Sequence, residues 1–326
     1  MKEKVLETIK KYNLIEAGDK IVLGVSGGPD SISMLDILRQ LKKEIGFEIY
    51  VAHINHMIRE EAIDDEKYVQ NYCEKNNIEF YAKRIDVPQI ANSKKIGTEE
   101  AGRKVRYEFF EEILQKTGSN KIAIAHNKND KIETIIMHLL RGSGLSGLKG
   151  IEPIRDNKYI RPLIECERQE IEKYCEENKL VPRIDKTNFE NDCTRNKIRN
   201  IVIPYVKEEF NPNIIETMDR LSQVATEESN YIETQAQKIY QKLLIEKTEK
   251  QITLKLKEFN EQEKVIKNRI ILLAVKELMG STQGIEQIHI QDIIKLCNNN
   301  IGNKFLTPNK NVKILLKDKK IYIIRL

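Results

Sequence analysis

The sequence contains no run of about eighteen apolar residues, so it has no candidate transmembrane helix. Its first residues lead into an amphipathic pattern without the apolar segment and cleavage site of a signal peptide, so we expect a cytoplasmic protein. The five cysteines are scattered, odd in number and never spaced as CxxC. This argues against a disulfide framework and against a zinc site, and it predicts free thiols.

Charge of one sign is only slightly in excess: 55 Lys and Arg against 50 Asp and Glu give a net charge of +5 and a pI near 8.7. The excess gathers at the end of the chain, where residues 303–326 hold seven Lys or Arg and one acid, Asp318. Such a segment is either a solvated lysine-rich surface or a patch that binds nucleic acid. Composition alone slightly favours the solvated surface.

Short apolar segments alternate with helical patterns through the first half of the chain. The first of them is almost continuously apolar, as in a parallel sheet buried on both faces. This alternation predicts an α/β fold with an open, mostly parallel, doubly wound sheet. We predict strands at 20–26, 47–55, 78–85, 120–127 and near 158–160, and helices at 2–15, 29–45, 62–76, 98–118, 129–142 and 167–179.

The pattern changes between Pro204 and Pro212, where we expect a domain boundary. One long polar helix at 215–244 and two shorter ones, 261–279 and 285–297, follow, and the last residues alternate as in a small hairpin. The sequence thus predicts a domain over residues 1–208. A second, mainly helical domain over 209–326 would end in the basic hairpin. With 326 residues and 40% hydrophobic content, the chain can form two cores.

Six small or polar residues, SGGPDS at 26–31, lie between the first predicted strand and the next helix. Glycine lets the backbone approach a ligand, and the unpaired N–H groups of a helix N-terminus suit phosphate. Asp30 in such a loop indicates a shared Mg²⁺, because a carboxylate beside phosphates needs a cation. A capped turn is the simpler alternative. The loop has neither the Gly-Lys-Ser/Thr of a Walker A motif nor the GxGxxG spacing.

These six residues resemble the PP-loop of the N-type ATP pyrophosphatases, which cleave ATP between the α- and β-phosphates. With four further stretches they are similar to the tRNA(Ile)-lysidine synthase family over roughly the first two thirds of the chain. The stretches are AHINHMIRE (52–60), EEAGRKVRYEFF (99–110), AHNKNDKIETIIMHLLRGSGLSGLKGI (125–151), and RPLIECERQEIEKYC (161–175) with RIDKTNFENDCTRNKIRNIVIP (183–204).

The resemblance implies a ligase that forms a carbon–nitrogen bond, with ATP and Mg²⁺ as cofactors. ATP adenylates the C2 oxygen of the wobble cytidine in the isoleucine tRNA with a CAU anticodon, and free L-lysine then displaces AMP to give lysidine. The implied partners are this tRNA, gripped by the helical domain, and L-lysine; a homodimer is a further expectation. The alternatives are another PP-loop enzyme that modifies tRNA or amidates a substrate, and a non-catalytic nucleotide- or RNA-binding protein.

The candidate site residues are those that match the family's motifs. For ATP they are Ser26, Gly27, Gly28, Pro29, Asp30 and Ser31, with Asp30 on Mg²⁺ and the backbone of Ala52 and His53 near adenine. For catalysis they are Asp30, Arg106, Asp130, Glu133 and Arg195. For lysine and tRNA they are His126, Asp130, Glu133, Arg141, Arg195 and Arg199.

Several of these residues also have a plainer interpretation. Arg106 can stabilise charge on the α-phosphate or form a surface ion pair. Asp130 and Glu133, three apart at a helix start, can bind the ammonium groups of lysine and help to deprotonate its amine, or only complement the helix dipole. His126 orients substrate or packs. Asn129 stands where the family usually has Asp, which weakens any role for two adjacent acids.

Overall fold

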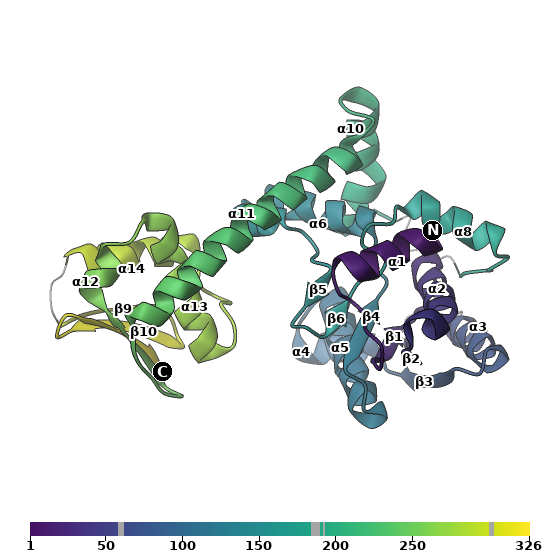
Figure 1. Cartoon of the computed structure of the whole chain (residues 1–326), viewed down its shortest axis with the longest axis horizontal. Helices are drawn as coiled ribbons and strands as arrows, with labels where there is room; N and C mark the ends of the chain where they lie inside the picture. Colours follow the sequence, from purple (N-terminus) through teal and green to yellow (C-terminus); the bar gives the residue numbers. More distant parts are fainter. Residues whose placement is uncertain (58–61, 184–189, 192, 300–302) are drawn as a thin grey trace. The chain divides into compact units, whose positions relative to one another are not determined.

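The computed structural model describes residues 1–57, 62–183, 190–191, 193–299 and 303–326 (Figure 1). They form two compact units, Met1–Gln223 and Val224–Leu326, each with its own hydrophobic core. Helix α11 (Ile214–Leu243) belongs to both, since the division falls within it. Residues 58–60, 184–189 and 192 of the family-like stretches lie outside the described residues.

The first unit is built on a six-stranded sheet in the order β3-β2-β1-β4-β6-β5. Neighbouring strands run parallel except β5 and β6. The predicted α/β class with an open, mostly parallel sheet is therefore confirmed, although β5 was not predicted. The strands are β1 (Lys20–Gly24), β2 (Glu48–Asn55), β3 (Glu79–Arg84), β4 (Lys121–Ile124), β5 (Ile154–Arg155) and β6 (Tyr159–Ile160).

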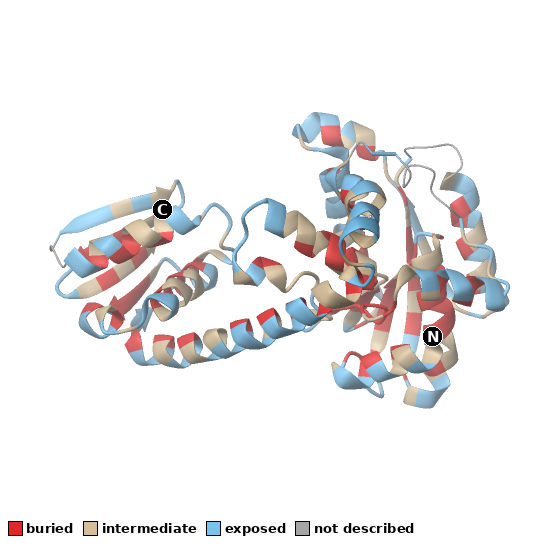
Figure 2. Ribbon diagram, turned by 90° about the horizontal axis from the view of Figure 1, so that it is seen from above, coloured by how far each residue is buried: buried red, intermediate tan, exposed pale blue. Residues whose placement is uncertain are grey.

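Helices pack against both faces of this sheet, as a doubly wound fold requires. In β1 the side chains of Ile21 and Leu23 enter one core, and Val22 enters another. Buried residues accordingly run along the strands in Figure 2. The first core takes residues from α1 (Lys2–Lys11), α2 (Pro29–Ile45), α3 (Ala62–Lys75) and α8 (Arg168–Glu177); the second takes them from α5 (Thr98–Thr117), on which α4 (Val87–Lys94) packs.

Glycine at the end of β1 lets α5 come close to the sheet. A Cβ atom on Gly24 would lie 2.4 Å from Cζ of Phe110, which is closer than any real side chain allows. The ring of Phe110 therefore fills the space directly before the glycine loop. A larger residue at this position would push α5 away from the sheet.

The last segments of the first unit pack on α6 (Lys128–Leu140). Its Ile132 and Ile135 share a core with Ile203 and Ile215. Because the start of α11 is buried in this core, the division after Gln223 lies later than the boundary predicted after residue 208. The remaining helical segments of this unit are α7 (Leu145–Leu148), α9 (Thr194–Lys197), a π-helical turn (Ile198–Val202) and α10 (Ile203–Glu209).

The second unit contains an antiparallel sheet in the order β7-β8-β11-β10-β9. The prediction of a helical domain with a small hairpin therefore understated its strands. Strand β8 has only five residues, and such a short alternation, with Ile252 and Leu254 buried, is hard to recognise after a long helix. Its elements are β7 (Leu244–Lys247), β8 (Gln251–Lys255), α12 (Leu256–Asn260), α13 (Lys264–Met279), α14 (Gln287–Asn299), β9 (Lys304–Asn309), β10 (Val312–Lys317) and β11 (Lys320–Arg325).

Two further predictions concern the state of the cysteines and the presence of a transmembrane helix. All five cysteines are free and four of them are buried, which agrees with the predicted free thiols. Within the described ranges, no helix is both long and apolar enough to cross a membrane.

Candidate active site

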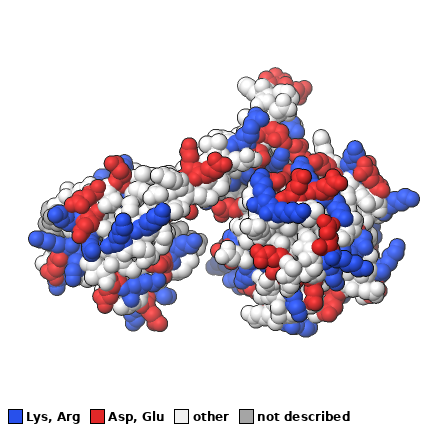
Figure 3. All heavy atoms as spheres, in the orientation of Figure 1, with Lys and Arg blue, Asp and Glu red and all other residues white. Residues whose placement is uncertain are grey.

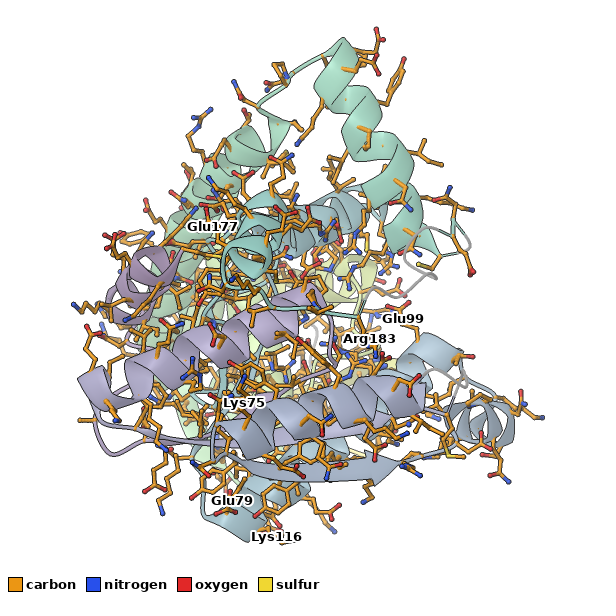
Figure 4. All side chains as sticks on the ribbon, turned by 90° about the vertical axis from the view of Figure 1, so that its right-hand side faces the viewer. Lys75, Glu79, Glu99, Lys116, Glu177 and Arg183 are labelled. Carbon is orange, nitrogen blue, oxygen red and sulfur yellow. The ribbon has the colours of Figure 1, made fainter. Side chains whose placement is uncertain are left out.

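The candidate residues gather at the carboxyl ends of the central strands. The glycine loop 26–31 follows β1, and His126 follows β4. In Figure 4, Glu99 at the start of α5 and Arg183 lie toward this edge, whereas Glu79 at the start of β3 lies at the opposite edge. Ligands of open α/β sheets bind beyond the carboxyl ends of the strands. The fold therefore brings the predicted loop to the edge where a ligand is expected.

The glycine loop closes around the hydroxyl of Ser31. This Oγ accepts hydrogen bonds from the N–H groups of Ser26 and Gly27, both at 3.1 Å, and donates to the Gly28 carbonyl at 3.0 Å. Gly27 has a φ of +95°, a conformation that favours glycine. Gly28 caps α2 and Pro29 opens it, so the free N–H groups of the first turn face the loop. Ser31 thus shapes the glycine loop from within.

Asp30 is tied to the end of β4. Asn127 Nδ2 donates to Asp30 Oδ1 at 2.9 Å. Burial raises the pKa of Asp30 to about 6, and repulsion from the Asp130 carboxylate contributes to the rise. Two carboxylates that repel each other favour a shared cation. Among the described residues no cluster of three or more His, Cys, Asp or Glu forms a metal site, so Mg²⁺ here would also need phosphate or water oxygens.

Asn127 also begins α6, which carries the two predicted lysine-binding carboxylates. Its Oδ1 accepts from the Asp130 N–H at 2.9 Å, and Asp130 Oδ2 accepts from the Asn127 N–H at 3.1 Å. This reciprocal pair is a capping box. Sequence reasoning missed Asn127, although a cap residue three positions before an acid is that motif's signal. One turn further along, Glu133 is 1% exposed.

Three arginines surround these carboxylates. Arg199 donates from Nε to Glu133 Oε1 at 2.7 Å, and from Nη2 to Glu133 Oε2 at 2.8 Å and Asp130 Oδ1 at 3.0 Å. Arg168 Nη2 lies 3.4 Å from Glu133 Oε1 and 3.6 Å from Asp130 Oδ1. Arg195 Nε lies 3.8 Å from Glu133 Oε2. Arg195 and Arg199 were predicted for this site, whereas Arg168 was missed because only the fold brings α8 to α6.

The carboxylates and the three arginines around them form a charged centre, in which the positive and negative charges nearly balance. Three guanidiniums face the carboxylates of Asp30, Asp130 and Glu133. A further cation, such as the ammonium group of lysine, therefore enters favourably only if a guanidinium leaves or an anion is added. The two predicted lysine-binding carboxylates are thus already occupied by arginine side chains.

Asn129, which stands where the family usually has Asp, links α6 to the start of α8. Its Oδ1 accepts from the Arg168 N–H at 3.0 Å at the start of α8. An Asp at this position would accept the same bond while adding a negative charge. The substitution therefore preserves the link between α6 and α8 and leaves the charges of the centre near balance.

Strand β2 is bonded to Val25, the residue between β1 and the glycine loop. The Ala52 carbonyl accepts from the Val25 N–H at 3.0 Å, and His53 Nδ1 lies 2.9 Å from the Val25 carbonyl. The His53 side chain is 2% exposed, and burial lowers its pKa. The ring of His53 is therefore a packing group. The expected contact of the Ala52 and His53 backbone with adenine stays a prediction.

Arg106 projects from α5 beside His56. Its Nη2 lies 3.4 Å from His56 Nε2. Desolvation and the neighbouring Arg106 lower the pKa of His56 to about 4, whereas Arg106 itself is exposed. In the described part of the chain no carboxylate lies within 4.0 Å of Arg106, unlike the three arginines around Glu133. Its charge is available to an anion.

His126 and Arg141 lie at different ends of the α6 region. His126 Nδ1 accepts from Arg161 Nε at 3.2 Å, a partner that sequence reasoning missed. Arg141 is an exposed residue just past the last turn of α6, about 16 Å along the axis from Asp130. The structure therefore does not bring Arg141 to the carboxylates, and a contact between Arg141 and tRNA stays a prediction.

Comparisons with known proteins identify the family. Residues 1–206 match the PP-loop domain. The tRNA(Ile)-lysidine synthase of Clostridioides difficile (strain 630) is 46% identical over 322 residues, which cover 98% of this chain and 70% of that protein. The chain belongs to the tRNA(Ile)-lysidine synthase family. The synthase of Clostridium acetobutylicum is 48% identical over 306 residues, covering 94% of this chain and 66% of that protein.

The chain spans about two thirds of the length of these curated relatives. The predicted membership in the lysidine synthase family is confirmed, and the PP-loop match supports the predicted use of ATP. Among solved structures, the U34-tRNA thiolase of Methanococcus maripaludis matches with a TM-score of 0.56 and 20% identity, covering 68% of this chain and 77% of that one. This last similarity supports the fold alone.

Proposed function

We propose that the chain ligates free L-lysine to C2 of the wobble cytidine of tRNA(Ile) with a CAU anticodon, using ATP. First the C2 oxygen attacks the α-phosphorus and pyrophosphate leaves. Then the lysine amine attacks C2, AMP leaves, and the amine proton passes to a carboxylate. The proposal rests on one observation: the glycine loop and the buried residues Asp130 and Glu133 lie together at one edge of the sheet. A cytoplasmic location and a homodimer stay predictions.

The ATP site would use the loop and α5. The first N–H groups of α2 and the exposed Ser26 hydroxyl bind the β- and γ-phosphates, which is supported by the cap geometry of the loop. Arg106 stabilises the α-phosphate as its charge grows. Asp30 would hold Mg²⁺ together with phosphate oxygens, and its raised pKa beside Asp130 supports that fit. The ion would neutralise phosphate charge during adenylation.

The lysine site would use Asp130 and Glu133. Both carboxylates are almost fully buried, so an ammonium group bound to them would be held by strong, weakly screened interactions. The carboxylate nearest the attacking nitrogen accepts its proton, which turns an unreactive ammonium into a nucleophilic amine. The buried position supports this role because water does not compete for the proton.

Lysine binding would require Arg199 to leave these carboxylates. Arg199 now occupies both oxygens of Glu133 and one oxygen of Asp130. The triphosphate of ATP and the phosphates of tRNA supply the negative charge to which a freed guanidinium can turn. We therefore expect lysine to bind tightly only after ATP and tRNA. Arg195 would leave Glu133 more easily, because its contact with this carboxylate is longer, at 3.8 Å.

The second unit would bind tRNA through the open face of its sheet. Both signs of charge appear on this unit in Figure 3, so total charge does not single out a face, but the strand register does. Lys255 pairs with Lys320 and Lys320 with Lys317, while Tyr322 pairs with Leu315 and Leu315 with Phe305.

The alternate residues of these strands face the helices, since Ile314, Leu316 and Ile323 are buried with α13 and α14. On the open face Phe305 is 57% exposed, and Lys313 Nζ lies 4.4 Å from the centre of its ring. Aromatic rings flanked by lysines bind RNA by stacking and by phosphate contacts. This arrangement favours the nucleic-acid interpretation of the basic end over a merely solvated surface.

The test is incorporation of radiolabelled lysine into tRNA with ATP, comparing the CAU isoleucine tRNA with the methionine tRNA that shares its anticodon. We expect label in the isoleucine tRNA alone and loss of label in Asp30→Ala. The matched control is Asp156→Ala, an exposed acid paired with Arg155 outside the site. Label in neither tRNA, with ATP still split to AMP, would redirect the proposal to another nucleophile or RNA.

A further inference from the structure

Arg161 and His126 form a pair that the proposed reaction has not yet used. They follow adjacent parallel strands, β6 and β4, whose register joins Ala123 to Ile160. Arg161 Nε donates to His126 Nδ1 at 3.2 Å. The Arg161 backbone is held as well, because its N–H donates to the Pro153 carbonyl at 2.9 Å. The sheet therefore fixes the position of both residues.

Arg161 is unusual for a buried arginine. It is 4% exposed, and none of the carboxylates in the described ranges lies within 4.0 Å of it. Its other named partner is the Glu152 carbonyl, which accepts from Nη1. Burying a guanidinium without a carboxylate costs stability. Residues that break this rule are found at functional sites more often than elsewhere.

The chemistry of the contact determines the state of the imidazole. A guanidinium can only donate hydrogen bonds, so Nδ1 of His126 must be the acceptor and carries no proton. The proton of the neutral ring is then on Nε2. Protonating Nδ1 would break the bond and place a second positive charge beside Arg161.

The charged groups around the ring reinforce this state. Asp130 on α6 favours protonation, while Arg161, Arg103 on α5 and Arg195 on α9 oppose it. With burial as the largest cause, they lower the pKa of His126 to about 3. The one carboxylate among them, Asp130, is itself bonded to Arg199.

We propose that Arg161 is a positioning residue that keeps His126 in the Nε2–H tautomer, so that His126 serves ligation as a permanently neutral hydrogen-bond donor. This inference rests on the proposed function. The Nε2–H group of His126 would then donate a hydrogen bond to an anionic or carbonyl oxygen of the reacting groups. It also excludes His126 as the base that takes the proton of lysine, which leaves that task to the carboxylates of α6.

The experiment reads the imidazole directly and then its effect on rate. The chain has five histidines, so ring signals of ¹⁵N-labelled enzyme can be assigned by their loss in single variants such as His126→Gln. We expect wild-type His126 to show the Nε2–H tautomer and not to titrate between about pH 5 and 8. In Arg161→Met the Nδ1–H tautomer should become populated and the pKa of His126 should rise, while burial, Arg103 and Arg195 still hold it below the ordinary value of about 6.5.

Rates give the second readout, through the pH profile of kcat/KM for lysine incorporation. Arg161→Met should gain an acidic limb that Arg161→Met/His126→Gln lacks. His126→Ala should lose about 100-fold, as when one preorganised donor is removed, and His126→Gln, which retains an N–H, should lose about 10-fold or less. The matched control is Arg155→Met, a neighbouring arginine stacked 4.3 Å from the Tyr159 ring, which should leave the profile unchanged.

Three results would overturn the proposal: a wild-type His126 that titrates between about pH 5 and 8, an unchanged profile in Arg161→Met, or equal losses in His126→Gln and His126→Ala. If Arg161→Met does not fold, the wild-type spectrum still decides the tautomer. Failure of the proposed function looks different, because the wild-type enzyme would then show the expected tautomer but incorporate no lysine.

Discussion

Glu133→Gln is the most direct perturbation of the lysine site. The substitution keeps the shape of a side chain that is 1% exposed but removes its charge. It also replaces one acceptor oxygen with an amide that donates, so Arg199 loses one of its two hydrogen bonds to this residue. The variant therefore changes the charge of the centre while leaving its packing in place.

The expected losses follow from these contacts. A charge-assisted hydrogen bond contributes about 1.5 to 3 kcal/mol, so losing the bond to the ammonium group should raise KM for lysine about 10- to 150-fold. Adenylation does not involve that ammonium group, so pyrophosphate release should stay within about threefold of wild type. The variant has one carboxylate fewer to neutralise the three guanidiniums. Its free energy of unfolding should therefore be about 2 to 4 kcal/mol lower than that of the wild type.

The assay measures lysine incorporation against lysine concentration, and separately ATP cleavage with tRNA before lysine is added. Glu165→Gln is the matched control: Glu165 accepts from Lys11 at 2.5 Å and from Tyr12 at 2.9 Å, and not from the arginines around Glu133. It should lose stability without a change in KM. If KM for lysine in Glu133→Gln stays within about twofold of wild type, the assignment of the lysine site is wrong.

Three further outcomes are expected. Arg199→Ala should let the free enzyme bind lysine at least about 10-fold more tightly by calorimetry, and an unchanged affinity would contradict displacement. Replacing Lys313, Lys317 and Lys320 by Glu should weaken tRNA binding and reduce the slope of log K against log salt by about 1 for each phosphate that these lysines neutralise. An unchanged slope would mean that this face of the sheet is a solvated surface that does not bind tRNA. The folded-state pKa of Asp30, about 6, lies above its unfolded value, so its stabilising effect is present below about pH 4 and lost as pH rises through 6. In EDTA, Asp30→Asn should therefore unfold at higher urea than wild type at pH 7.5 but not at pH 4, and equal midpoints at pH 7.5 would contradict the raised pKa.

The loop and the strand before it were readable from the sequence because their conformation is local. Helix α2 spans Pro29–Ile45, the range that helical periodicity predicted, and Gly27 adopts the left-handed backbone that its residue type permits. Strands β7 and β8 were missed for the opposite reason. Each has five residues or fewer, and β11, the pairing partner of β8, lies about seventy residues further along the chain.

The same contrast holds within the site. Asp130 and Glu133 could be predicted as a pair because three residues along a helix place them on one face. Asn127, Arg161 and Arg168 could not, since their roles depend on which strand or helix end lies opposite them in space. Asn127 alone had a local signal, the capping box.

The sequence by itself determined the alternation of the first four strands with helices, the glycine loop, and the family to which its motifs point. Only the tertiary structure decided that Arg199 bonds to Glu133 and Asp130, and that Arg161 donates to His126. The physical reason is that periodicity and backbone preference act between near neighbours along the chain. The energy between charges instead depends on their distance through space and on burial, and both are set when the fold closes.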